Sequence, residues 1–191
     1  GKSITFANDR NQAVLGLSGY LCAKFLTKSV YWSLDGFGHL EFTPQNGDSG
    51  QMKSLSDKIP WAGCVSNIRT ASIKEGTTVS MEADGSLARM FQYCKNLTDC
   101  DLRGLVTTDA VDMESMFDGC VSLMNVDLSG FKTGQVKSFK NMFRNCTVLE
   151  SLSISTFDGS RLTDMSGMFE GCKAVNFIVF PAAFNTRATE D

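Results

Sequence analysis

The chain has 191 residues, of which 42% are hydrophobic and 20% are charged, and its formal net charge is −3. This length allows one substantial hydrophobic core, in one or two domains. Lys and Arg are scattered along the sequence, which argues against a nucleic-acid partner, and no apolar run is long enough to form a transmembrane segment. The sequence begins at Gly1 without a signal peptide, and we expect an export signal to have been removed.

Residues 1–28 have an apolar periodicity that fits one face of a helix. The residues on that face are Val14, Leu17, Leu21 and Phe25. Gly16 and Gly19 lie in the same stretch and lower its helix propensity. The pattern predicts a helix that these two glycines weaken.

A β-hairpin is predicted over residues 29–43. Two short runs there alternate apolar and polar residues, and the turn sequence Asp-Gly-Phe-Gly separates them. Residues 44–60 are polar and rich in Gly, Ser and Asp, which predicts an exposed loop. We treat residues 1–60 as an N-terminal header.

Residues 61–191 contain a 26-residue repeat. Met-Phe pairs recur without drift at residues 90–91, 116–117, 142–143 and 168–169, and a Cys follows each pair at the same offset. A period of this length with Leu-x-x-Val-x-Leu inside it is typical of leucine-rich-repeat solenoids. We predict a degenerate capping repeat at 61–85, regular repeats at 86–180 and a C-terminal cap at 181–191.

Each repeat combines a helical period with a strand. Met113, Met116, Phe117 and Cys120 are spaced as on one face of a short helix. Residues suited to cap its first turn precede each copy, at Ser86, Asp112, Ser138 and Asp164. Residues that favour a helix end follow at Gly119, Asn145 and Gly171, although Tyr93 does not fit. The predicted fold class is an α/β leucine-rich-repeat solenoid, with parallel strands on one face and short helices on the other.

Seven cysteines raise the question of disulfides. Four of them occupy one column of the repeat, at Cys94, Cys120, Cys146 and Cys172, and Cys100 occupies a column otherwise filled by aliphatic residues. We predict that these five are buried thiols, because free Cys behaves as a small apolar residue. Cys64 is expected to head the first column. Whether Cys22 and Cys64 are bonded stays open.

The sequence offers no set of residues for catalysis. His39 is the only histidine, which leaves no histidine pair for a metal and no evident partners for a nucleophile. We interpret it as a surface residue of the hairpin. The identical turns of a solenoid would place the cysteines in a row and not at tetrahedral corners. We therefore expect no enzyme activity and no cofactor.

The outward side of the strands is the candidate binding surface. Alternation along each strand exposes Asp99, Asp101, Arg103, Asn125, Asp127, Ser151 and Ser153. Asp101 and Asp127 should face each other with like charge, which is unfavourable unless a group such as Arg103 offsets it. A Ca²⁺ ion at Asp99, Asp101 and Asp127 is one further reading, and a solvated face without a ligand is another.

The repeat resembles a known family. Residues 112–123 read Asp-Met-x-x-Met-Phe-x-Gly-Cys-x-Ser-Leu, and residues 127–133 read Asp-Leu-Ser-x-Phe-x-Thr. This motif is similar to the BspA-like bacterial leucine-rich-repeat surface proteins in their 26-residue version, and it covers residues 86–180. The resemblance implies an extracellular or cell-surface bacterial protein that attaches to a host or matrix protein or to a glycan.

The resulting expectation is a non-enzymatic binding module. A structural spacer without a ligand is the alternative, and a hydrolase is a third reading. The sequence leaves the ligand, the anchoring mode and the oligomeric state open.

Overall fold

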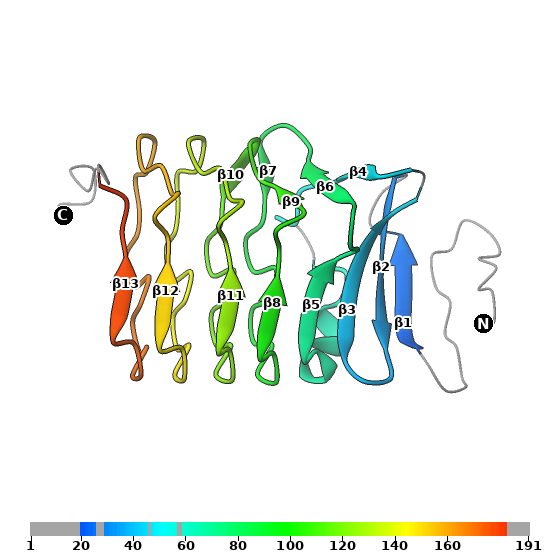
Figure 1. Ribbon diagram of the computed structural model, residues 1–191, viewed down its shortest axis with the longest axis horizontal. Coiled ribbons are helices and arrows are strands. Elements are labelled where there is room, and N and C mark those ends of the chain that lie inside the picture. The colour runs from blue at the N-terminus through cyan, green and yellow to red at the C-terminus, as the bar shows by residue number, and fades with distance from the viewer. Residues whose placement is uncertain (1–19, 26–28, 46, 57–58, 183–191) are drawn as a thin grey trace.

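The computed structural model describes residues 20–25, 29–45, 47–56 and 59–182. Over these residues the chain winds into a solenoid of parallel strands, one turn to each repeat (Figure 1). One long row of strands lies along it. The row holds β1 (Tyr20–Phe25), β2 (Val30–Asp35), β3 (His39–Pro44), β5 (Thr70–Ile73), β8 (Asp99–Asp101), β11 (Asn125–Asp127), β12 (Ser151–Ser153) and β13 (Phe177–Val179).

Two further parallel ladders close each turn. One contains β4 (Ser49–Met52), β6 (Thr78–Met81) and β9 (Leu105–Val106). The other pairs β7 (Gly85–Ser86) with β10 (Ala110–Asp112), and single bridges carry it on to Ser138 and Asp164. Successive turns are therefore bonded to one another along more than one side of the solenoid.

The predicted hairpin is present and starts the solenoid. Strands β2 and β3 pair antiparallel, and β3 then pairs parallel with β5. The sheet therefore crosses the expected boundary between residues 60 and 61 without interruption. The segment 44–60 is not only a loop, because β4 lies within it and pairs with β6.

The helix expected in residues 1–28 is wrong for residues 20–25, which form a strand. Leu21 and Phe25 lie in β1, which pairs antiparallel with β2 and so continues the sheet at its edge. The edge of the hairpin offers backbone hydrogen bonds to a neighbouring strand, and these outweigh a helical pattern weakened by glycine. Val14 and Leu17 lie outside the described residues.

The short helices expected in each repeat are also wrong. Among the described residues the structure has one 3₁₀ segment, η1 (Ala62–Asn67), and turns occupy the Met-Phe-Cys segments. Alternate backbone N–H groups there donate to the next repeat: Phe91 to the carbonyl of Met116 at 2.8 Å, and Phe117 to that of Met142 at 2.8 Å. Because these groups are bonded laterally, they cannot form the i to i−4 bonds of an α-helix.

Left-handed backbone conformations explain how these turns repeat. Arg89, Ser115 and Asn141 share one column and have φ values of 62°, 56° and 55°. A second column, four residues later, holds Tyr93 at 60° and Gly119 at 76°. A Cβ on Gly119 would also lie 2.6 Å from the ring of Tyr93 in the preceding turn. The Gly and Asn residues expected to end helices instead serve these turns.

The residues expected to cap helices keep their acceptor role in a different structure. Ser86, Asp112, Ser138 and Asp164 each accept the N–H of the residue two positions on. This local bond is that of an Asx or Ser/Thr turn. Their side-chain oxygens therefore begin each turn of the solenoid, which no helix follows.

The core is built from the repeated columns. Phe91, Phe117, Phe143 and Phe169 stack face to face, with ring centroids 5.4, 5.4 and 5.7 Å apart. The thiol of Cys120 donates to the carbonyl of Phe91 at 3.1 Å, and those of Cys146 and Cys172 repeat this contact one turn on. The predicted free thiols at the five repeat positions are confirmed, although Cys172 is only half-buried. Cys64 is half-buried against the same core.

Residues 183–191, most of the predicted C-terminal cap, lie outside the described part. No helix in the described ranges is long and apolar enough to cross a membrane.

Candidate functional site

The parallel register arranges the outward side chains in straight rows, and we call the surface they form the strand face. One row runs His39, Thr70, Asp99, Asn125, and a second runs Glu41, Ser72, Asp101, Asp127. On the separate β12–β13 sheet the corresponding pairs are Ser151 with Phe177 and Ser153 with Val179. In each row, side chains of adjacent strands lie side by side and can interact.

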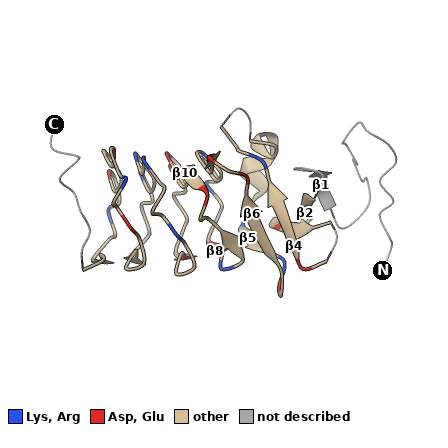
Figure 2. Ribbon diagram, turned by 90° about the horizontal axis from the view of Figure 1, so that it is seen from above, with Lys and Arg blue, Asp and Glu red and all other residues tan. Residues whose placement is uncertain are grey.

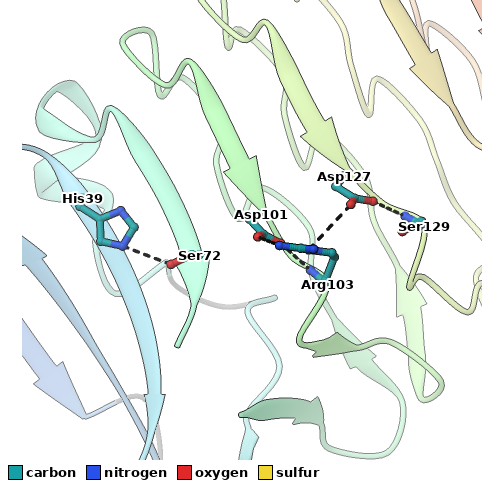
Figure 3. Close-up of polar contacts among 6 residues, drawn as sticks. All are labelled: His39, Ser72, Asp101, Arg103, Asp127 and Ser129. Carbon is teal, nitrogen blue, oxygen red and sulfur yellow. Dashed lines mark hydrogen bonds and ion pairs between the residues drawn. The ribbon is translucent and has the colours of Figure 1, made fainter. Parts of the chain in front are cut away.

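Arg103 lies between two carboxylates of this face (Figure 3). Its Nε and a terminal nitrogen donate to the two oxygens of Asp101 at 3.0 and 2.6 Å. The same Nε lies 3.9 Å from Oδ2 of Asp127. The expected repulsion between Asp101 and Asp127 is thus offset by a guanidinium, and the side chains of Arg103, Asp101 and Asp127 stay 68%, 47% and 46% exposed.

Hydrogen bonds also hold the carboxylates of Asp99 and Asp127. Asn125 donates from Nδ2 to Asp99 at 2.9 Å, and the backbone N–H of Ser129 donates to Asp127 at 2.9 Å. These bonds stabilise the charged forms. The pKa of Asp99 is lowered chiefly by Asn125, that of Asp101 by Arg103, and that of Asp127 by Ser129.

The suggested Ca²⁺ site at Asp99, Asp101 and Asp127 is not formed. In the described part of the chain, no three acidic, Cys or His side chains converge so as to hold a metal ion. The reason is local: Arg103 occupies the space beside Asp101, and Asp99 turns to Asn125. The five residues form two separate groups on neighbouring turns, Asp99 with Asn125 and Arg103 with Asp101 and Asp127.

Ser151 and Ser153 belong to a different part of the face. They lie on β12, which pairs with β13 and not with β11. A shallow groove of about 450 Å³ separates them from Asn125 and Asp127. The seven predicted residues therefore fall into two bonded groups around β8 and β11 and a groove, and Asn125 and Asp127 belong both to these groups and to the groove lining.

His39 also belongs to the strand face, whereas the sequence indicated only a surface residue of the hairpin. Its Nδ1 lies 2.8 Å from Oγ1 of Thr70, and its Nε2 lies 3.1 Å from Oγ of Ser72 (Figure 3). What the sequence did not reveal is that β3 pairs with β5, which brings His39 and Glu41 into the same rows.

A second charged cluster lies away from the strand face. The carboxylate of Asp118 is fully buried, and Arg144 from the next turn donates to its two oxygens at 3.0 and 2.8 Å. Gln92 from the preceding turn adds a third hydrogen bond at 3.1 Å. Because every partner is another turn of the solenoid, we assign this cluster to the fold.

Charges of both signs are interspersed along the molecule. Figure 2 shows segments with Lys or Arg and segments with Asp or Glu scattered along the described turns, without a continuous basic stripe. A surface of this kind gives little attraction to phosphate backbones. The strand face itself is acidic, since Glu41, Asp99, Asp101 and Asp127 accompany Arg103.

The stacked turns and the aligned polar rows define a β-solenoid repeat protein. The chain belongs to the family described as "Mycoplasma protein of unknown function, DUF285", whose sequence pattern matches residues 85–190. No curated protein matches the chain. A solved structure of a leucine rich cell surface protein from Faecalibacterium prausnitzii A2-165 is similar to it, with a TM-score of 0.47 and 13% sequence identity. The similarity covers 88% of this chain and 44% of that one, so the chain spans less than half the length of that protein.

Proposed function

We propose that the protein is a non-enzymatic binding module of a bacterial cell surface, and that it attaches through the strand face. The observation that carries the proposal is the Asp101–Arg103–Asp127 network, which is held by hydrogen bonds and an ion pair and yet remains accessible to solvent. Ordered polar groups on a rigid sheet can bind a partner at a low entropic cost. The BspA-like repeat supports an extracellular location and a host protein, matrix protein or glycan as partner.

Binding suits this face better than catalysis does. Ser72 and His39 are within hydrogen-bonding reach of each other, as a nucleophile and its base would be. The second nitrogen of His39, however, meets the hydroxyl of Thr70, where a triad has a carboxylate to stabilise the imidazolium. Replacing Ser72 by Ala should therefore leave a screen of hydrolase substrates unchanged.

A structural spacer is the second candidate, and one observation favours it. The carboxylates of the strand face already have partners within the protein, in Asn125, Arg103 and Ser129. A face that is satisfied in this way needs no ligand. A spacer would tolerate any substitution on the face that leaves the solenoid folded.

An adhesion assay separates the two candidates. Wild-type protein and the double variant Asp101→Asn/Asp127→Asn would be measured on host-cell monolayers and on immobilised matrix proteins. A binding module should lose about tenfold in affinity, because charge-assisted hydrogen bonds to the partner weaken. The double variant Asp48→Asn/Asp109→Asn, at two exposed positions off the strand face, is the matched control. Wild-type protein that binds no better than albumin would favour the spacer.

A further inference from the structure

The sheet is split between β11 and β12. The strands on either side pair normally, β8 with β11 and β12 with β13, but residues 125–127 and 151–153 exchange no backbone hydrogen bond. Figure 1 shows these two strands further apart than their neighbours. The groove of about 450 Å³ lies at this split, in the size range of small-ligand sites.

Main-chain groups border the groove on both sides. The N–H of Asn125 donates to Thr98, towards β8. Because successive residues of a strand direct their N–H and C=O groups to opposite sides, those of Val126 point towards β12. The N–H of Ile154 donates to Val179, towards β13, so those of Ser153 point towards β11. Donors and acceptors that a continuous sheet would pair thus face the groove.

The side chains around the groove combine hydroxyl and amide groups with apolar surfaces. Asn125, Ser151 and Ser153 supply the polar groups. Phe177, 65% exposed, stands beside Ser151 in the same row, and Met124, 52% exposed, lies on the opposite side. An exposed aromatic ring beside convergent polar side chains suits a ligand with both C–H faces and hydroxyl groups.

The charge of the groove favours an uncharged occupant. Of the residues that line it, Asp127 alone is charged, and Arg103 lies 3.9 Å from its carboxylate. Because Arg103 is also bonded to Asp101, the three side chains together carry a net charge of −1, which disfavours an anionic ligand. A basic ligand would have to compete with Arg103, and an anionic ligand would meet the carboxylate at short range.

An added peptide strand does not fit the split. A strand inserted between β11 and β12 would require them to be about 9.6 Å apart, which is two strand spacings. The same two repeats are held together by the rings of Phe117 and Phe143, whose centroids are 5.4 Å apart. Hydroxyl groups can enter a narrower opening than a polypeptide backbone.

We propose that the groove between β11 and β12 binds a neutral oligosaccharide. Its hydroxyl groups bond to Asp127, Ser151, Ser153 and the unpaired main-chain groups, and one sugar face lies on the ring of Phe177. The proposal rests on the proposed function and names its ligand class. It assigns attachment to the C-terminal half of the strand face.

The test is a glycan array probed with the full chain. The array carries neutral hexose and N-acetylhexosamine oligosaccharides beside sialylated and sulfated ones, and the cell-adhesion assay runs in parallel. We expect neutral oligosaccharides to bind. Phe177→Ala should weaken that binding about tenfold, and Ser151→Val/Ser153→Val should weaken it similarly, since valine retains the strand shape but cannot form the hydrogen bonds. Phe37→Ala, at a ring that is 85% exposed in the hairpin turn, is the matched control.

Each other outcome overturns the proposal in a distinguishable way. If the chain adheres to cells but binds no neutral oligosaccharide, the groove proposal is wrong and the binding module stands. Binding that all folded variants retain would place the sugar site elsewhere. Preference for the anionic oligosaccharides would contradict the charge argument. If the chain neither adheres nor binds sugars, both proposals fail together. Equal urea midpoints for wild type and variants show that folding is intact.

Discussion

Arg144 holds the fully buried carboxylate of Asp118 across two turns of the solenoid, with nitrogen–oxygen distances of 3.0 and 2.8 Å. Removing one partner of a buried ion pair leaves the other uncompensated and is strongly destabilising. Arg144→Ala should therefore lower the urea midpoint clearly. Arg103→Ala, which removes an equivalent bidentate contact at an exposed site, should lower it little. A midpoint of Arg144→Ala as close to wild type as that expected for Arg103→Ala would show that the Asp118 pair adds little stability.

Trp61 joins the hairpin to the first repeats, and we predict that it is indispensable. Its ring lies 5.1 Å from that of Phe42 and 5.8 Å from that of Trp32, and its Nε1 donates to the carbonyl of Met90 at 2.8 Å. Trp61→Ala should cost about 4 kcal/mol of unfolding free energy. Trp61→Phe retains a ring and should cost about 2 kcal/mol, since the Met90 carbonyl loses its donor.

Urea denaturation followed by the fluorescence of Trp32 measures both variants. Phe37→Ala, at an exposed ring of the same hairpin, is the control and should be neutral. The role assigned to Trp61 is wrong if Trp61→Ala unfolds at the wild-type midpoint.

The repeat cysteines should be free but unreactive in the folded protein. Burial raises the pKa of Cys94 to about 12 and also raises those of Cys100, Cys120 and Cys146. The thiolate is the reactive form, so a disulfide reagent at pH 8 should modify these residues only after unfolding. Half-buried Cys172 should react first of the five. Denatured, unreduced protein that contains no titratable thiol would contradict the assignment.

The strand-face carboxylates predict a weak acid dependence of stability. The pKa values of Asp99, Asp101 and Asp127 are lowered in the folded state. Their contribution is therefore present above the unfolded-state pKa of about 3.9 and is lost as the pH falls through the folded values. Because the three carboxylates are accessible to solvent, which screens their interactions, the contribution is small.

Urea midpoints measured from pH 6 to pH 2 test this dependence. They should fall less steeply below pH 4 for Asp99→Asn/Asp101→Asn/Asp127→Asn than for wild type. Parallel curves for the two proteins would mean that the network adds no stability.

The apolar columns were predictable from the sequence because apolar residues recur at the same position of every repeat. Phe117 and Cys120 are fully buried, as their column requires, and Asp101 pairs in register with Asp127. The spacing could not reveal that turns, and not helices, occupy the Met-Phe-Cys segments. Positions i, i+3, i+4 and i+7 also point inward when consecutive turns bond to neighbouring repeats, and the polar column that contains Ser115 adopts a left-handed conformation which no helix contains.

The strand face was predictable only where the repeat is regular. Alternation along the strands placed Asp99 and Asn125 outward, and they are hydrogen-bonded. His39 was missed because its place depends on long-range pairing between a hairpin strand and the first turn. The split at β11 and β12 was also missed, since the repeat does not change its period there. Such features depend on how turns stack, which a single repeat does not encode.

The proposed attachment through the strand face is tested most directly by obstructing it. Ser153→Arg places a long side chain in the groove at an exposed strand position, and Ser160→Arg places the same side chain at an exposed position off the strand face. Adhesion to host-cell monolayers should be lost with Ser153→Arg and unchanged with Ser160→Arg, at equal urea midpoints. If the folded Ser153→Arg protein adheres as well as wild type, the strand face around the groove is not the binding surface.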